Sequence, residues 1–150
     1  MGRKIVPDLV QNQVLTILAP SLSVRDAAKA MADRNIGAVL VAEGGRLRGI
    51  CTERDVTHRV VAKGRDPNLT TIADIMTANV ITATPKTTIN DAMAQMDAGY
   101  FRHLPVVDNG KLVGIISVKD VVHARIETQA LEVDSLTEFV HRGVLAGGLR

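Results

Sequence analysis

The chain carries the same pattern of residues twice, 65 positions apart. Residues 20–58 align with residues 85–123 without a gap, and 12 of the 39 aligned pairs are identical. Both copies close on a cassette of glycine, a short apolar run, a hydroxyl residue, a basic residue and aspartate: GICTERD from Gly49 and GIISVKD from Gly114. An internal repeat constrains the fold strongly, because each copy must form the same supersecondary unit. With only two copies, the sequence predicts a paired module rather than a solenoid.

Each copy predicts a β-α-β-β-α unit, which places the chain in the α+β class. A short extended piece comes first, and Ser23 or Thr88 then stands as the N-cap of a helix with apolar residues at helical spacing. Two strands follow, joined by a tight turn at Gly44-Gly45 or Asn109-Gly110, where positive φ angles are favoured. The extended pieces are expected at residues 15–18 and 80–83, and the paired strands at 38–42 and 46–51 and at 103–107 and 111–117.

The repeat also sets the domain boundaries. We assign residues 8–64 to a first domain, 65–71 to a linker, 72–125 to a second domain and 126–150 to a C-terminal extension. Asp66-Pro67-Asn68 breaks the chain between the copies. The extension is expected to be one helix or a pair of helices, with its last residues frayed. Its candidate apolar face contains Leu131, Val133, Leu136, Phe139 and Val140.

The composition excludes several classes of protein. The chain is 46% hydrophobic and 23% charged, as expected for a folded domain, and its net charge of +2 is too small for broad binding to nucleic acid or to an anionic membrane. The one cysteine, Cys51, excludes an internal disulfide and any multi-cysteine metal site. The N-terminus lacks the apolar core of a signal peptide, and no apolar run is long enough to span a membrane. We therefore expect a cytoplasmic protein.

The cassette supports two interpretations. A hydroxyl residue three positions before an acidic residue is typical of a helix cap, and the chain contains three further Ser/Thr-x-x-Asp segments that fit this role. At Thr52 and Ser117, however, a strand runs directly into the cap and a cation precedes the aspartate. Backbone amides exposed at such a junction favour an anion, and a carboxylate suits the two hydroxyls of a ribose. The pattern is therefore consistent with capping alone or with nucleotide binding.

The two copies with these cassettes, and the segment FRHLPVVDNGKLVGIIS at 101–117 above all, resemble a pair of cystathionine-β-synthase (CBS) domains, also called a Bateman module. The resemblance covers roughly residues 8–125. It departs from the family at Leu40, where the second copy has Pro105. It implies two domains related by a pseudo-twofold axis, with two clefts between them that bind adenosine compounds: AMP, ADP, ATP, and sometimes NAD or S-adenosylmethionine. The resemblance implies no required cofactor.

The resemblance also assigns site residues, and it crosses the copies. Asp55 and Asp120 would bind ribose hydroxyls, with Thr52 and Ser117 beside the ribose and phosphate. The Asp55 cleft would take its adenine walls from Val80, Ile81 and Phe101, and the Asp120 cleft from Thr16, Ile36 and Gly37. Arg102 and His103 match phosphate-contacting positions, and Arg54 and Lys119 could assist. Because Gly37 and Ala38 stand where the second copy has Arg102 and His103, the two clefts should differ.

No catalytic or metal-binding set emerges from the sequence. His58 and His123 repeat, but no cysteine or carboxylate cluster accompanies them, and we expect no enzyme activity. The leading hypothesis is a sensor that binds an adenine nucleotide and reports it to an unknown effector protein. The alternative is an assembly module that needs no ligand, in which the cassettes are only caps.

A homodimer is also expected, because members of this family usually cover their helical faces by meeting a second pair. The residues expected to be partly exposed there are Ala27, Ala28, Met31 and Val56 in the first copy and Ala92, Met93, Met96 and Val121 in the second. The C-terminal helix could cap that interface.

Overall fold

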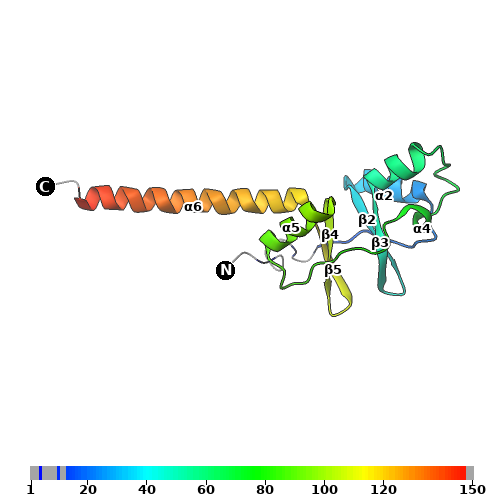
Figure 1. Ribbon diagram of the computed structural model, residues 1–150, viewed down its shortest axis with the longest axis horizontal. Helices are drawn as coiled ribbons and strands as arrows, with labels where there is room; N and C mark the ends of the chain where they lie inside the picture. Colours follow the sequence, from blue (N-terminus) through cyan, green and yellow to red (C-terminus); the bar gives the residue numbers. More distant parts are fainter. Residues whose placement is uncertain (1–3, 5–9, 11–12, 148–150) are drawn as a thin grey trace.

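The computed structural model describes residue 4, residue 10 and residues 13–147, without the side chains of 144–147. Two small α+β domains lie side by side, and one long C-terminal helix, α6, extends away from them (Figure 1). The order of elements in the two domains follows the repeat, which confirms the predicted tandem fold. The expected start of the first domain, at residue 8, falls outside the described residues.

The first domain contains a three-stranded sheet in the order β1-β2-β3. Strand β1 runs parallel to β2, and β3 runs antiparallel to β2. Its elements are β1 (Ile17–Leu18), α2 (Val24–Arg34), β2 (Ala38–Glu43), β3 (Arg46–Thr52), α3 (Glu53–Val56) and a π-helical segment η1 (Thr57–Val61), and the short helix α4 (Ile72–Ile75) follows the linker. The helix expected after the second strand is present, and its second part widens into η1, in which the amide of Ala62 bonds to the carbonyl of Thr57.

The second domain repeats this arrangement with one strand fewer. Among the described residues, its sheet consists of β4 and β5, because the extended piece expected at residues 80–83 is reduced to a single parallel bridge between Ala83 and Val106. This bridge occupies the position that the Leu18–Val41 pair has in the first domain. The elements are α5 (Ile89–Gly99), β4 (His103–Asp108), β5 (Lys111–Ser117) and α6 (Val118–Gly147).

The two strand turns have the backbone that the sequence predicted. Gly44 and Gly45 have φ angles of 58° and 77°, and Asn109 and Gly110 have φ angles of 49° and 81°. Two successive positive φ angles are the mark of the tight hairpin turn that matches the twist of the flanking strands. Each turn therefore fixes the register of the strands that lead into one cassette.

Each domain has its own core between its sheet and its helices. This corrects our expectation for the helical faces, because most of the residues expected there are buried in these cores: Ala27, Met31, Ala92, Met96 and Val121. They occupy the side of each helix that faces its own sheet. Ala28, Val56 and Met93 are the ones that stay partly exposed. Cys51, with no exposed area, is a core residue as predicted.

A connecting segment lies along the last strand of each domain. The segment that leads into the second domain lies along β3, and the segment that leads into the first domain lies along β5. In the first domain, Ile50 and Thr77 exchange two backbone hydrogen bonds, each 3.0 Å long. In the second domain, the side-chain amide of Gln13 takes over this role: its Nε2 donates to the carbonyl of Ile115 at 3.0 Å, and its Oε1 accepts from the amide of Ile115 at 2.9 Å. Strands β3 and β5 also contact each other. The two cassettes are thereby held on either side of the boundary between the domains.

Candidate functional site

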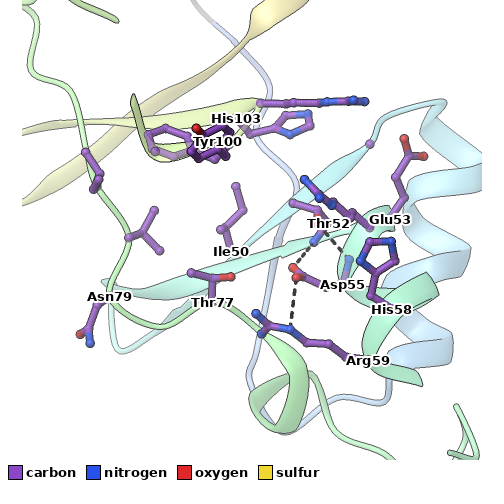
Figure 2. Close-up of a pocket in the computed structure, with 17 residues that line it drawn as sticks. Ile50, Thr52, Glu53, Asp55, His58, Arg59, Thr77, Asn79, Tyr100 and His103 are labelled. Carbon is purple, nitrogen blue, oxygen red and sulfur yellow. Dashed lines mark hydrogen bonds and ion pairs between the residues drawn. The ribbon is translucent and has the colours of Figure 1, made fainter. Parts of the chain in front are cut away.

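The boundary between the domains holds two clefts, which we name after their aspartates. The Asp55 cleft has a volume of about 450 Å³ and combines the first cassette with the lead-in segment and the α5–β4 turn of the second domain (Figure 2). The Asp120 cleft has a volume of about 1080 Å³ and combines the second cassette with residues before β1 and after α2. Pockets of a few hundred to about a thousand Å³ suit a small-molecule ligand.

Every site residue predicted from the sequence lies on one of these clefts. The Asp55 cleft is lined by Thr52, Arg54, Asp55, Val80, Ile81, Phe101, Arg102 and His103. The Asp120 cleft is lined by Thr16, Ile36, Ser117, Lys119 and Asp120. Gly37, Arg102 and His103 line both clefts. The structure thus brings the cassette of each copy to the walls expected from the other copy.

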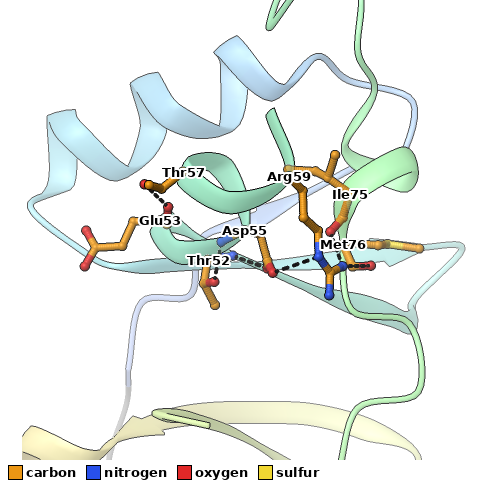
Figure 3. Close-up of polar contacts among 7 residues, drawn as sticks. All are labelled: Thr52, Glu53, Asp55, Thr57, Arg59, Ile75 and Met76. Atoms are coloured by element: carbon orange, nitrogen blue, oxygen red, sulfur yellow. Dashed lines mark hydrogen bonds and ion pairs between the residues drawn. The ribbon is translucent and has the colours of Figure 1, made fainter. Parts of the chain in front are cut away.

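Both cassettes form helix caps. The amide of Thr52 donates to Oδ2 of Asp55 at 2.9 Å, and the amide of Asp55 donates to the Thr52 hydroxyl at 3.1 Å (Figure 3). Ser117 and Asp120 make the same two bonds, 2.8 and 3.2 Å long. In both capping boxes, the amide of the hydroxyl residue donates to Oδ2 of the aspartate. Capping does not use the other carboxylate oxygen, Oδ1, which is therefore available for a further contact.

The caps correct one expectation. We expected backbone amides at the two strand-to-helix junctions to attract an anion, but most of these amides already have partners. Besides the amides in the boxes, the amide of Glu53 bonds to the carbonyl of Gly37 at 3.0 Å, and that of Val118 bonds to the carbonyl of Arg102 at 2.9 Å. A backbone group with an internal partner gains little from a ligand. A phosphate in these clefts would therefore depend mainly on side chains for its contacts.

The two aspartates lie in different surroundings. Asp55 is 8% exposed, and its Oδ1 lies 3.7 Å from Nε of Arg59. Arg59 is held in turn by its Nη1, which donates to the carbonyl of Ile75 at 2.7 Å (Figure 3). Asp120 is exposed, and the residue four positions after it is Ala124. The clefts therefore differ at Arg59, a cause that the prediction did not include. Arg102 and His103, on which the prediction rested, line both clefts.

Several residues of the clefts were missed in the sequence. Arg34 lines the Asp120 cleft, where its Nη1 donates to the hydroxyl of Thr16 at 2.9 Å. Glu53 lines both clefts, and Arg59 and Tyr100 line the Asp55 cleft. A usable signal was present, because only one copy is charged at two of these positions. Arg34 aligns with Gly99, and Arg59 stands opposite Ala124, one residue beyond the aligned ranges.

His103 stands between the clefts, close to Gly37 and the carboxylate of Glu53. Burial lowers the pKa of this histidine below its ordinary value of 6.5, and the nearby charge of Arg102 lowers it further, while Glu53 and Asp120 act in the opposite direction. The imidazole is therefore neutral at pH 7 and can contribute a hydrogen bond to a ligand, but no full positive charge.

This pKa shift predicts how the stability depends on pH. As the pH falls below about 6.5, the unfolded chain binds a proton at His103 more readily than the folded chain does, so the free energy of unfolding decreases. We expect the wild-type chain to lose more stability between about pH 7.5 and pH 5.5 than a His103→Gln variant loses. Urea unfolding at the two pH values measures this difference. Equal losses in the two proteins would contradict the prediction.

Within the described part of the chain, no group of three or more His, Cys, Asp or Glu side chains could hold a metal ion. The described helices also include none that is both long and apolar enough to cross a membrane. Burial raises the pKa of the Cys51 thiol to about 12, and the nearby Asp55 adds to this effect, so the thiol remains protonated and unreactive near neutral pH.

Comparison with known proteins shows the family. The CBS domain model matches residues 8–62 and 72–127. The chain is 32% identical over 139 residues to the CBS domain-containing protein YhcV of Bacillus subtilis, covering 93% of this chain and 97% of YhcV. Its structure is similar to that of a putative signal-transduction protein with CBS domains from Burkholderia ambifaria, with a TM-score of 0.74 and 41% identity over 78% of this chain and 85% of that one.

A further similar structure is the CBS domain pair of protein MJ0100 in complex with 5′-methylthioadenosine and S-adenosyl-L-methionine. It has a TM-score of 0.76 and 27% identity, and the match covers 85% of this chain and 99% of that one. The repeat, the paired α+β domains and these matches lead to one conclusion. The chain belongs to the CBS domain family, as a tandem pair of CBS domains.

Proposed function

We propose that the chain is a regulatory module that binds an adenosine-containing ligand in the clefts between its two CBS domains and signals the bound state to a separate effector protein. One observation carries the proposal: each cleft places the hydroxyl and carboxylate of one domain opposite walls from the other. A ligand there would contact both domains at once. Its binding would therefore affect their relative arrangement, which a partner protein could detect.

The chemistry of the Asp55 cleft supports this ligand class. Val80, Ile81 and Phe101 offer apolar contact to a base, and Oδ1 of Asp55 can accept hydrogen bonds from ribose hydroxyls. Arg54 and Arg102 supply the positive charge that a phosphate needs.

In the Asp120 cleft, Lys119 and Arg102 supply this positive charge. AMP, ADP and ATP fit this description, and NAD shares its adenosine part. The MJ0100 domain pair, solved with two adenosine compounds, supports the same class of ligand.

A thermal-shift experiment tests the proposal. We expect at least one of AMP, ATP, NAD and S-adenosylmethionine to raise the melting temperature, because a ligand at a hundred times its dissociation constant adds about 2.7 kcal/mol to the free energy of unfolding. The double variant Asp55→Ala/Asp120→Ala should lose most of this shift. Asp26→Ala is its matched control, because Asp26 makes the same capping box with Ser23 on α2 but lines neither cleft. It should lose stability and keep the shift.

An assembly module that needs no ligand is the second candidate, and the capping boxes favour it, since they give both cassettes a structural role. No shift with any of the four compounds would support this alternative over nucleotide sensing. None of the three relatives reported above has an enzyme name, and we propose a regulatory rather than a catalytic role.

A further inference from the structure

Helix α6 begins inside the second domain and continues far beyond it (Figure 1). Val121 and Ala124 are buried against that domain, whereas every side chain from 129 to 143 is exposed. At 1.5 Å per residue, the 30-residue helix is about 45 Å long. The exposed part includes Val133, Thr137 and Val140, which are poor helix formers. Most of the stability of a helix in a protein comes from packing of its apolar face, and this part has no such packing against the described part of the single chain. The exposed part therefore calls for a partner.

Most of the exposed apolar residues of α6 follow a heptad repeat, although Leu131 and Phe139 lie off it. Val122, Ile126, Gln129, Val133, Leu136 and Val140 alternate at spacings of four and three residues, which is the spacing of a coiled-coil seam. We call these six residues the α6 seam. The apolar members are between 44% and 63% exposed. Charged residues of the same segment, such as Glu127, Asp134 and Glu138, lie off the seam. A helix with this pattern fits a second helix with the same pattern.

From this pattern we propose that α6 pairs with α6 of a second copy as a parallel two-stranded coiled coil. The β-branched residues Ile126, Val133 and Val140 recur every seven residues, at the position where such residues favour parallel dimers. Leu136 takes the other core position, where leucine favours the same arrangement. The inference does not depend on nucleotide binding.

A second observation supports the parallel orientation. At the base of the seam, Val118 and Val122 line a groove on the second domain together with Tyr100, which is 87% exposed. Met93, one of the partly exposed helix residues, lies in the same groove. A parallel pair brings the two grooves to the same end, where each can cover the other. An antiparallel pair would leave the two grooves far apart.

The mass of the full chain in solution tests the pairing. We expect sedimentation equilibrium at micromolar concentration to give twice the chain mass of 16.1 kDa. The double variant Val133→Glu/Leu136→Glu should weaken the dimer by at least about a hundredfold, because glutamates would be buried in the seam without partners. Both residues are exposed in the single chain and glutamate favours helix, so the variant should fold normally. Leu131→Glu is the matched control, because Leu131 is 66% exposed but lies off the seam.

A monomeric wild-type chain would overturn the proposal. A double variant that dimerises as well as the control would also overturn it, as would an equal loss in both variants.

The orientation is tested with Gln129→Cys and Gly143→Cys, which replace two residues at equivalent heptad positions; a side chain at 143 meets no neighbouring atom. In a parallel pair both variants should form disulfide-linked dimers under mild oxidation, whereas an antiparallel pair cannot align both positions. Cys51, buried and protonated, adds no background. A missing cross-link in either variant would overturn the parallel arrangement.

Discussion

Replacing Arg102 by alanine is expected to weaken the binding of AMP by about ten- to hundredfold and to leave the binding of adenosine nearly unchanged. Arg102 lines both clefts. Most backbone amides at the cassettes already have internal partners, so a phosphate depends mainly on side-chain cations. Removing a charge-assisted hydrogen bond costs about 1.5–3 kcal/mol, which corresponds to this loss of affinity. Calorimetric titration with the two ligands measures the difference.

Two sets of variants sharpen this test. Arg25→Ala removes the same charge from α2 at a position that lines neither cleft, so it should leave both affinities unchanged. Asp55→Ala and Asp120→Ala should weaken AMP and adenosine alike, each at its own cleft, because both ligands carry the ribose hydroxyls. If Arg102→Ala weakens adenosine as much as AMP, Arg102 has a structural role and the phosphate assignment is wrong.

Replacing Gly49 by alanine is expected to cost about 3 kcal/mol of stability, at the upper end of the range for overpacked interiors. A Cβ at this position would lie 2.5 Å from the carbonyl oxygen of Thr77 and 2.9 Å from Sδ of Met76. The Thr77 carbonyl accepts the hydrogen bond from the Ile50 amide, so it cannot move without breaking the bridge between the domains. Urea unfolding of the variant measures the loss.

Gly114→Ala is the matched control, because Gly114 is the repeat counterpart of Gly49. Its added Cβ would meet side-chain atoms of Val10 and Gln13 rather than backbone. Side chains can shift further than a hydrogen-bonded backbone carbonyl, so this variant should lose less stability than Gly49→Ala. It should not be neutral, because Val10 is buried and β-branched and Gln13 is bonded to Ile115. Equal losses would show that the backbone contact at Thr77 is not what requires glycine at position 49.

The repeat made the fold predictable from the sequence. Hydrophobic periodicity, the capping residues Ser23 and Thr88 and the turns at Gly44-Gly45 and Asn109-Gly110 are local signals, and local signals survive in the structure because neighbouring residues produce them. The paired cassettes also indicated where the clefts form. The resemblance to CBS domains then supplied the cross-copy walls, which no local pattern in the sequence contains.

Other features depend on contacts between distant residues, and only the tertiary structure decided them. Arg59 reaches Asp55 because the carbonyl of Ile75, 16 residues further along the chain, holds it there. Gln13 replaces a backbone bridge at Ile115 across 102 residues. Hydrophobic spacing identified Ala27 and Met31 as one face of a helix, but only packing showed that this face covers the chain's own sheet. The spacing of apolar residues in the sequence determines which of them share one face of a helix. The elements that pack around the helix determine what that face contacts.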